Sequence, residues 1–239
     1  MDDSLTRQQI SDAVDPLGWR LILGAVVTHV RVPSLSAAAE AAVAAVSAVG
    51  ADGDGHLSLD LHADRVVLGL QTAATGFVTE HDVRLAQTVT VALAARELRT
   101  EPGDDTAVPQ AIEIAIDALD IPLIRPFWKA VTGYVEVPGP FDQLPGSLRS
   151  CPPDLPDGAL LDPLRRGPAI WFQQMDGPRP QRNRIHLDVD VAPELAHSRI
   201  DATLAAGGTL LSAEAAPAFW VLADPEGNEV CVCTWQGRD

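Results

Sequence analysis

Two histidines flank a short alternating segment, HLSLDLH, at residues 56–62. Strict alternation of apolar and polar residues is typical of a half-buried strand, on which His56 and His62 would share a face. An imidazole titrates near neutral pH, so either side chain could accept and then donate a proton during catalysis. The alternative interpretation is a solvated or purely structural histidine on a strand.

A carboxylate near the start of a helix is a third candidate. Thr79 is followed three residues later by Asp82, which is the pattern of a helix cap. We expect this helix to run to about Arg99. Because a carboxylate in the first turn stabilises the helix dipole, Asp82 has a structural interpretation as well as a catalytic one.

The elements around these residues alternate between helix and strand. The ranges expected for them are 6–15, 19–32, 34–49, 56–62, 66–71 and 79–99. This order predicts an α+β domain over residues 1–100, with an antiparallel sheet covered by helices on one face. Residues 101–110 are polar, acidic and proline-bearing, and we interpret them as a linker.

A strand–helix–strand pattern occurs twice in residues 111–239. With an offset of 73 (113 to 186), Glu113 falls on His186, and Gly133 falls on Ala206 at the end of the second helix. Prolines gathered between residues 138 and 180 predict long loops between short strands. A final strand pair is expected to turn at residues 224–228.

Bulk properties exclude some partners. The net charge of −16 and the pI near 4.6 would repel nucleic acid and anionic membranes. No window approaches the ~18 apolar residues that would span a bilayer, and the N-terminus does not resemble a signal peptide. Cys151, Cys231 and Cys233 lack the spacing of a disulfide framework. We therefore expect a soluble cytoplasmic protein with reduced thiols.

Residues 111–236 resemble the vicinal oxygen chelate superfamily, the glyoxalase and bleomycin-resistance fold. The segments that carry this resemblance are IEIAIDALD, FWKAVTGY, NRIHLDVDV and ADPEGNEVCV. It implies two βαβββ modules that curl around a cleft. Metal-using members hold a divalent ion with side chains from the first and last strands of each module. Transferred by position, these are Glu113, a residue near Gln173, His186, and Cys231 in place of the usual glutamate.

This ligand set mixes hard and soft donors, which suits neither Mg²⁺ nor Mn²⁺ but is acceptable to Zn²⁺. We expect no cofactor, with a divalent metal at Glu113, His186 and Cys231 as the alternative. Otherwise His186 is a hydrogen-bonded strand histidine and Cys231 a small buried hydrophobe. Four aromatic residues either line a ligand cleft or belong to the core: Trp128, Trp171, Phe172 and Trp220.

Residues 5–100 resemble a pterin carbinolamine dehydratase domain. The resemblance is carried by the run HLSLDLHADRVVLGLQTAATGFVTEHDVRLAQ and by the earlier Leu-Gly-Trp at 17–19. That family removes water from a hydroxylated pterin ring, with histidines as acid–base groups. Aligned on the Asp-Arg-Val at 64–66, its histidine pair falls on Gly55 and His56, and its third histidine on Ala73. Asp82 keeps the acidic position.

Two functions follow from these resemblances. The first is a lyase that acts on a pterin through His56 and Asp82, with His62 as a substitute partner. Its activity would be weak or lost, because an absent acid–base partner costs about 10²–10⁴ in rate. The alternative is a non-catalytic small-ligand-binding or resistance-type protein that uses the C-terminal cleft, with the N-terminal domain for oligomerisation or regulation. A homo-oligomer is expected under either.

Overall fold

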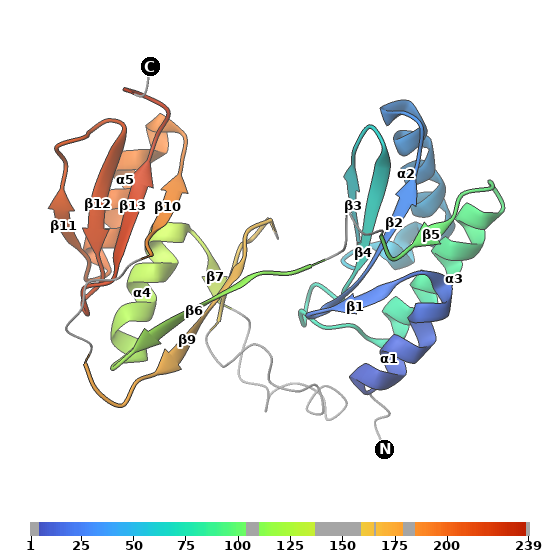
Figure 1. Ribbon diagram of the computed structural model, residues 1–239, viewed down its shortest axis with the longest axis horizontal. Coiled ribbons are helices and arrows are strands. Elements are labelled where there is room, and N and C mark those ends of the chain that lie inside the picture. The colour runs from blue at the N-terminus through green and yellow to red at the C-terminus, as the bar shows by residue number, and fades with distance from the viewer. Residues whose placement is uncertain (1–4, 104–109, 137–158, 165, 179–184, 238–239) are drawn as a thin grey trace. The chain divides into compact units, whose positions relative to one another are not determined.

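The computed structural model describes the chain except for residues 1–4, 104–109, 137–158, 165, 179–184 and 238–239. Among the described residues, a first compact unit ends at Ala111 and a second begins at Ile112. The two units are coloured from blue to green and from green to red in Figure 1. Each is described by itself.

The N-terminal unit contains a five-stranded antiparallel sheet in the order β1-β2-β4-β3, with β5 also paired to β2. Its elements in chain order are α1 (Arg7–Val14), η1 (Asp15–Leu17), β1 (Arg20–Ile22), β2 (Ala25–Arg31), α2 (Leu35–Val49), η2 (Gly50–Gly53), β3 (Leu57–Leu61), β4 (Arg65–Leu70), α3 (Glu80–Ala94) and β5 (Thr100–Glu101). Apart from the end of the last helix, these bounds agree closely with those expected from the sequence.

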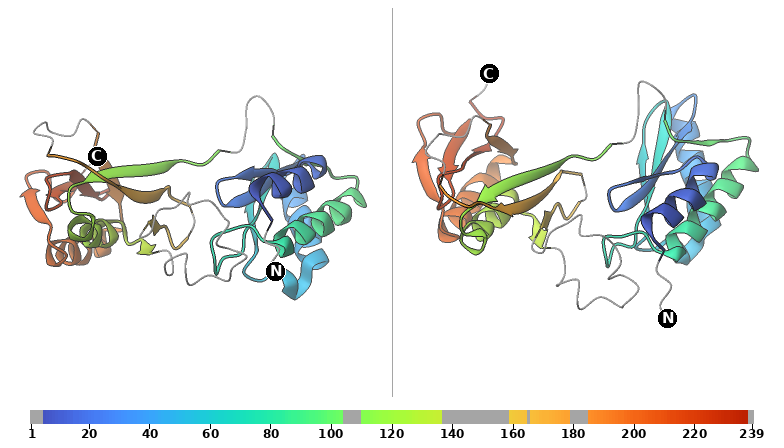
Figure 2. Two further views of the ribbon diagram at one scale, coloured as in Figure 1. Left: turned by 90° about the horizontal axis from the view of Figure 1, so that it is seen from below. Right: turned by 60° about the horizontal axis from the view of Figure 1, so that its bottom comes forward.

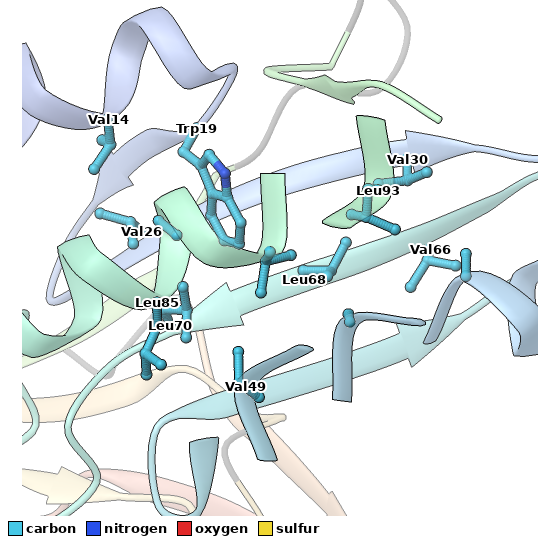
Figure 3. Packing of buried hydrophobic residues seen from close by; sticks show 14 of the residues in the cluster. Val14, Trp19, Val26, Val30, Val49, Val66, Leu68, Leu70, Leu85 and Leu93 are labelled. Carbon is cyan, nitrogen blue, oxygen red and sulfur yellow. The ribbon is translucent and has the colours of Figure 1, made fainter. Parts of the chain in front are cut away.

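The helices of this unit cover one face of the sheet (Figure 2). Alternate residues of β2 and β4 are buried, as in the run Val66, Leu68 and Leu70. Figure 3 shows these side chains packed with Trp19, whose indole nitrogen donates a hydrogen bond to the Thr90 hydroxyl over 2.9 Å. The predicted α+β arrangement, with helices on one face of an antiparallel sheet, is therefore confirmed.

Helix α3 ends at Ala94, earlier than the predicted Arg99. The chain turns out of the helix because Glu97 adopts a positive φ of 61° and the Leu98 amide bonds back to the Leu93 carbonyl. Thr100 and Glu101 then pair with β2 as strand β5. Glu101, the first residue of the expected linker, therefore belongs to the sheet.

Helix α2 corrects one expectation from the sequence. Among the described residues, the segment Leu35–Gly53 is long and apolar enough to cross a membrane by length and composition. Small side chains on its inner face, such as Ala38, Ala41 and Ala45, are buried in the core of the N-terminal unit. A core helix of a soluble domain passes the same test, so this segment is weak evidence for a membrane span.

The C-terminal unit consists of two βαβββ modules with the same strand order. The first contains β6 (Glu113–Ala118), α4 (Ile121–Thr132), β7 (Val135–Glu136), β8 (Leu160–Leu161) and β9 (Ala169–Gln174). The second contains β10 (Leu187–Asp190), α5 (Pro193–Ala205), β11 (Thr209–Ser212), β12 (Phe219–Ala223) and β13 (Glu229–Cys233). The sheets run β6-β9-β8-β7 and β10-β13-β12-β11, and in each the first strand is parallel to the last. The predicted paired modules are confirmed.

Matching helix ends show the repeat in detail. Gly133 is the C-cap of α4 with φ 73°, and Ala206 is the C-cap of α5, as the offset of 73 between the modules (133 to 206) requires. Most of the region expected to contain long proline-rich loops lies outside the described residues. The strand β8, two residues long, lies in this region, where the sequence predicted long loops between short strands.

The β12–β13 turn connects the second module to the first. Asp224 is buried in this turn and accepts hydrogen bonds from the Glu226 and Asn228 amides, each over 2.9 Å. Its other oxygen accepts from the Trp128 indole of α4, also over 2.9 Å. The Glu226 carboxylate caps the start of α4 by accepting from the amides of Leu119 and Asp120. The turn segment ADPEGN is thus a structural link between the modules.

Candidate functional sites

Asp82 forms the centre of a polar cluster in the N-terminal unit. It lies in the first turn of α3 with its side chain fully buried. One carboxylate oxygen accepts hydrogen bonds from the Thr79 amide over 2.7 Å and from the Thr79 and Thr72 hydroxyls, each over 2.8 Å. A buried carboxylate needs several donors to offset the cost of its desolvation, and here Thr79 of the cap and Thr72, which follows β4, supply them.

His56 lies directly before β3 and contacts the other oxygen of this carboxylate. Its Nδ1 is 2.8 Å from Asp82 Oδ1, and the imidazole is 19% exposed. An ionised carboxylate can only accept, so Nδ1 is the donor to Asp82 and Nε2 is the ring nitrogen left for exchange with a ligand. This arrangement orients an imidazole for proton transfer.

The two positions where the family has its other histidines are neighbours of this pair. The Ala73 amide donates to the Gly55 carbonyl over 2.8 Å, and the Gln71 amide donates to the His56 carbonyl over 3.1 Å. Gly55 and Ala73 therefore lie beside His56, which contacts Asp82. Only one of the three histidine positions carries an imidazole.

A second histidine that sequence reasoning missed, His81, stands beside His56. The ring centroids are 4.6 Å apart with an interplanar angle of 70°. His81 Nε2 donates to the Asp52 carbonyl over 2.9 Å, which leaves Nδ1 to accept from Arg84 over 3.4 Å. The sequence could have indicated His81, because it lies between Thr79 and Asp82, and the first turn of a helix places all three residues at the N-terminal end of that helix.

His62 does not join this site. It lies beyond the other end of β3, a strand of five residues, and its Nε2 is 3.1 Å from the Asp60 carboxylate. Five residues of strand span about 17 Å, so the shared face expected for His56 and His62 does not bring the two rings together. His62 is a half-exposed histidine paired with a surface aspartate.

A second cluster lies on the sheet of the second module. The ligand atoms of His186, Asp188 and Cys231 are all within 4.8 Å of one another. The parallel register of β10 and β13 places Asp188 directly opposite Cys231. His186 Nε2 is 3.4 Å from Asp188 Oδ1, and both of these side chains are more than half exposed. Cys231 is buried at 7% exposure.

The environment of Cys231 keeps its thiol protonated. Burial raises the pKa of Cys231 to about 12, and the Asp188 carboxylate beside it contributes in the same direction. Without a cation, this cysteine is the small buried hydrophobe that one interpretation of the sequence expected. Cys233, two residues along the strand, is likewise outside any disulfide.

The four-residue metal set that the family resemblance implies does not fit the observed geometry. Glu113 is not a member of the cluster around His186; its Oε1 is buried without a hydrogen-bond partner, and burial raises the pKa of its carboxyl group. Gln173 is not the residue of the first module that corresponds to Cys231. The register pairs Ala115 with Trp171 as it pairs Asp188 with Cys231, so Trp171 is the counterpart of Cys231.

Three of the four aromatic residues considered for ligand binding lie in the hydrophobic core. Trp128, Phe172 and Trp220 are 3%, 6% and 7% exposed and pack together with the residues of α4 and α5. Trp171 is half-buried and packs against the small cluster that contains Leu161. Ligand contact thus stays a prediction for Trp171, while the other three side chains are occupied in packing.

A cavity of about 360 Å³ lies elsewhere in the N-terminal unit. It is lined by residues of η1, the end of α3 and β5, together with Arg20 of β1 and Arg99, which precedes β5. None of the residues chosen from the sequence lines it. The polar cluster around Asp82 is therefore separate from this cavity.

Two family models match this chain. The model of the glyoxalase-like domain matches residues 113–233, and that of the pterin 4 alpha carbinolamine dehydratase matches residues 3–92. The first match spans just over half of the chain, which therefore belongs to the glyoxalase-like family. Its N-terminal unit is a pterin carbinolamine dehydratase-like domain. No curated protein sequence matches the chain.

Solved structures resemble each unit separately. A transcriptional coactivator/pterin dehydratase from Brucella melitensis is 22% identical and covers 38% of this chain and 98% of its own, with a TM-score of 0.34. A glyoxalase/bleomycin resistance protein/dioxygenase family enzyme from Burkholderia phytofirmans is 21% identical. The match covers 51% of this chain and 95% of that one, with a TM-score of 0.35. A glyoxalase/dioxygenase from Nostoc punctiforme is 15% identical. The match covers 55% of this chain and 94% of that one, with a TM-score of 0.40.

Proposed function

We propose that the N-terminal unit is a slow lyase that removes water from a hydroxylated pterin-type ring. The observation that carries this proposal is the contact of 2.8 Å between His56 Nδ1 and the fully buried Asp82 carboxylate. A histidine held in one orientation by a buried acceptor is the arrangement that general acid–base catalysis needs. The match to the dehydratase family supports the choice of substrate class.

In this proposal Asp82 is a positioning residue and His56 the catalytic one. Nε2 of His56 accepts a proton from a ring N–H of the substrate while the C–O bond of the carbinolamine breaks. The protonated His56 gives this proton to the departing hydroxyl, which leaves as water, and the imidazole returns to its starting form, so the reaction is balanced without a further reactant. Because Asp82 accepts from Nδ1, the carboxylate stabilises the imidazolium that forms.

The small side chains at two neighbouring positions limit the rate. Gly55 and Ala73 carry no group that can exchange a proton, so one imidazole must both accept and donate. The absence of an acid–base partner typically costs about 10²–10⁴ in rate. We therefore expect acceleration well above buffer but far below that of a site with three histidines.

The test is the decay of a 4a-carbinolamine pterin in the presence of the full-length protein. Acceleration above buffer that His56→Ala abolishes supports the proposal. His62→Ala is the matched control, because His62 is paired with Asp60 away from the site and its loss should leave the rate unchanged. Equal rates with protein and with buffer, or equal losses in the two variants, would overturn it.

The second candidate is a binding function without turnover, in the C-terminal unit. It is favoured by Trp171, whose half-buried indole stands on the sheet of the first module at the position corresponding to Cys231. Such a side chain can stack on a flat organic ligand. Calorimetric titration with the pterin separates the two candidates: His56→Ala should weaken binding in the first, and Trp171→Ala in the second.

We also propose that the protein is a cytoplasmic homo-oligomer. Neither Cys231 nor Cys233 is in a disulfide, which suits a reducing compartment. Helix α2 exposes Val43 at 65% and Val46 at 48%, which would be covered in an assembly. Light scattering coupled to gel filtration tests the oligomer, and a monomeric mass at micromolar concentration would contradict it.

A further inference from the structure

The cluster of His186, Asp188 and Cys231 has the geometry of a metal site. In a tetrahedral site with metal–ligand bonds of about 2.0–2.3 Å, neighbouring ligand atoms are about 3.3–3.8 Å apart. The 3.4 Å between His186 Nε2 and Asp188 Oδ1 lies within this range. The Cys231 sulfur is within 4.8 Å of a ring nitrogen of His186 and of a carboxylate oxygen of Asp188, so a small side-chain rotation would complete the set.

The donor types select the metal. Imidazole nitrogen, carboxylate oxygen and thiolate sulfur are the three kinds of ligand that Zn²⁺ takes in proteins. Mg²⁺ and Ca²⁺ prefer oxygen ligands alone, so the sulfur of Cys231 disfavours them. The chemistry of the cluster therefore points to zinc or a metal of similar softness.

The sheet holds the cluster ready for an ion. Asp188 and Cys231 are register partners on the parallel strands β10 and β13, and His186 directly precedes β10 on the same face as Asp188. Cys231 forms the buried floor, while His186 and Asp188 are 56% and 54% exposed at the opening. Ligands on paired strands lose little freedom on binding, and the open side provides an entry path.

We propose that the second module binds one Zn²⁺ through His186, Asp188 and Cys231. This set lies within a single module and includes Asp188, so it differs from the set shared between two modules that the family resemblance implied. Three protein ligands leave a fourth position for water or for an oxygen atom of a small ligand, as in catalytic rather than structural zinc sites. The proposal does not depend on the pterin chemistry of the N-terminal unit.

Equilibrium dialysis with Zn²⁺ tests the site in the full-length protein purified without a metal-affinity tag. We expect one equivalent to be retained. Changes that touch only the surroundings of a metal ligand already weaken affinity 10–100-fold, so Asp188→Ala, which removes a ligand, should cost about 100-fold or more. Glu113→Gln is the matched control and should leave zinc affinity unchanged. No stoichiometric retention, or a larger loss in Glu113→Gln than in Asp188→Ala, would overturn the proposal.

Cobalt substitution tests the sulfur ligand by a separate readout. Bound Co²⁺ should show a sulfur-to-metal charge-transfer band and the strong visible bands of a tetrahedral ion. Cys231→Ser should remove the charge-transfer band, and Cys233→Ser, two residues away on the same strand, should retain it. The reverse pattern would refute the assignment of Cys231. If Cys231→Ser does not fold, His186→Ala provides the test instead. His186 is exposed, so this substitution should not disturb the core, and it must remove the tetrahedral bands.

Discussion

Two histidine–aspartate pairs in this chain lead to different chemistry. In the N-terminal unit His56 and Asp82 are 2.8 Å apart with the carboxylate fully buried, whereas His186 and Asp188 are 3.4 Å apart with both side chains more than half exposed. Asp82 is surrounded by donors from the protein, while Asp188 stands beside a thiol and an imidazole. Burial and the supply of donors, rather than residue type, thus decide what an aspartate can do.

The reason is a competition for the carboxylate oxygens. The oxygens of Asp82 are occupied by Thr72, Thr79 and His56, so no lone pair is directed toward an incoming ion. Such a carboxylate orients its histidine and stabilises a positive imidazole. Asp188 is instead more than half exposed, beside His186 and the Cys231 thiol, so a cation can reach its carboxylate. The comparison predicts different responses to the same substitution.

The largest expected effect is on folding stability when Asp82 is removed. Asp82→Ala leaves the buried Thr79 amide without its acceptor and removes the partner of His56, so we expect a loss of about 3–5 kcal/mol. Urea unfolding measures this change. Asp60→Ala is the control, because Asp60 is 73% exposed and its pairing with His62 should contribute less than about 1 kcal/mol. Similar losses in the two variants would contradict the comparison.

A third aspartate, Asp224, tests whether burial alone gives an aspartate a role in either proposed site. It is buried with donors like Asp82, but these donors are the Trp128 indole and the amides of its own turn. Asp224→Ala should cost about 2–3 kcal/mol, because the indole N–H loses its partner in the core. Zinc stoichiometry and pterin decay, measured under conditions where the variant is folded, should stay unchanged. A loss of either at full folding would show that Asp224 acts beyond structure.

A pH effect of intermediate size should arise from Cys231. The pKa of this thiol is raised to about 12 in the folded protein from a model value of 9.0. Above pH 9 the unfolded chain therefore releases a proton that the folded protein retains, and stability falls as the pH rises toward 12. The loss should reach roughly 1 kcal/mol at pH 10. Urea midpoints at pH 8 and pH 10 measure it, and Cys231→Ser should show a smaller decrease.

The smallest effect is expected for Asp188 in the absence of metal. Its side chain is more than half exposed and its ion pair with His186 lies at the surface, so Asp188→Ala should change stability by less than about 1 kcal/mol. Zinc should raise the melting temperature of the parent protein but not of this variant. Calorimetric melting with and without zinc measures both. A large loss without metal would place Asp188 with Asp82 as a structural aspartate.

Local sequence signals determined most of the elements. The Thr6 and Thr79 caps, the alternation of residues 56–62 and the offset between Glu113 and His186 all predicted features that the structure contains. These signals depend on residues a few positions apart, or on a repeated pattern, so they can be recognised without knowledge of the packing. The strand β5 could not, because it forms only by pairing with β2, which is distant in sequence.

The members of each site were decided by tertiary structure. His56 was identified from the sequence, but its neighbours Thr72 and His81 became evident only when β4 and α3 met around Asp82. Asp188 was missed because its partnership with Cys231 results from the parallel register of two strands that are distant in sequence. Which side chains converge, and how much water they retain, is determined by strand pairing and burial. Those are properties of the folded chain, and they separate the buried acid–base pair from the open metal site.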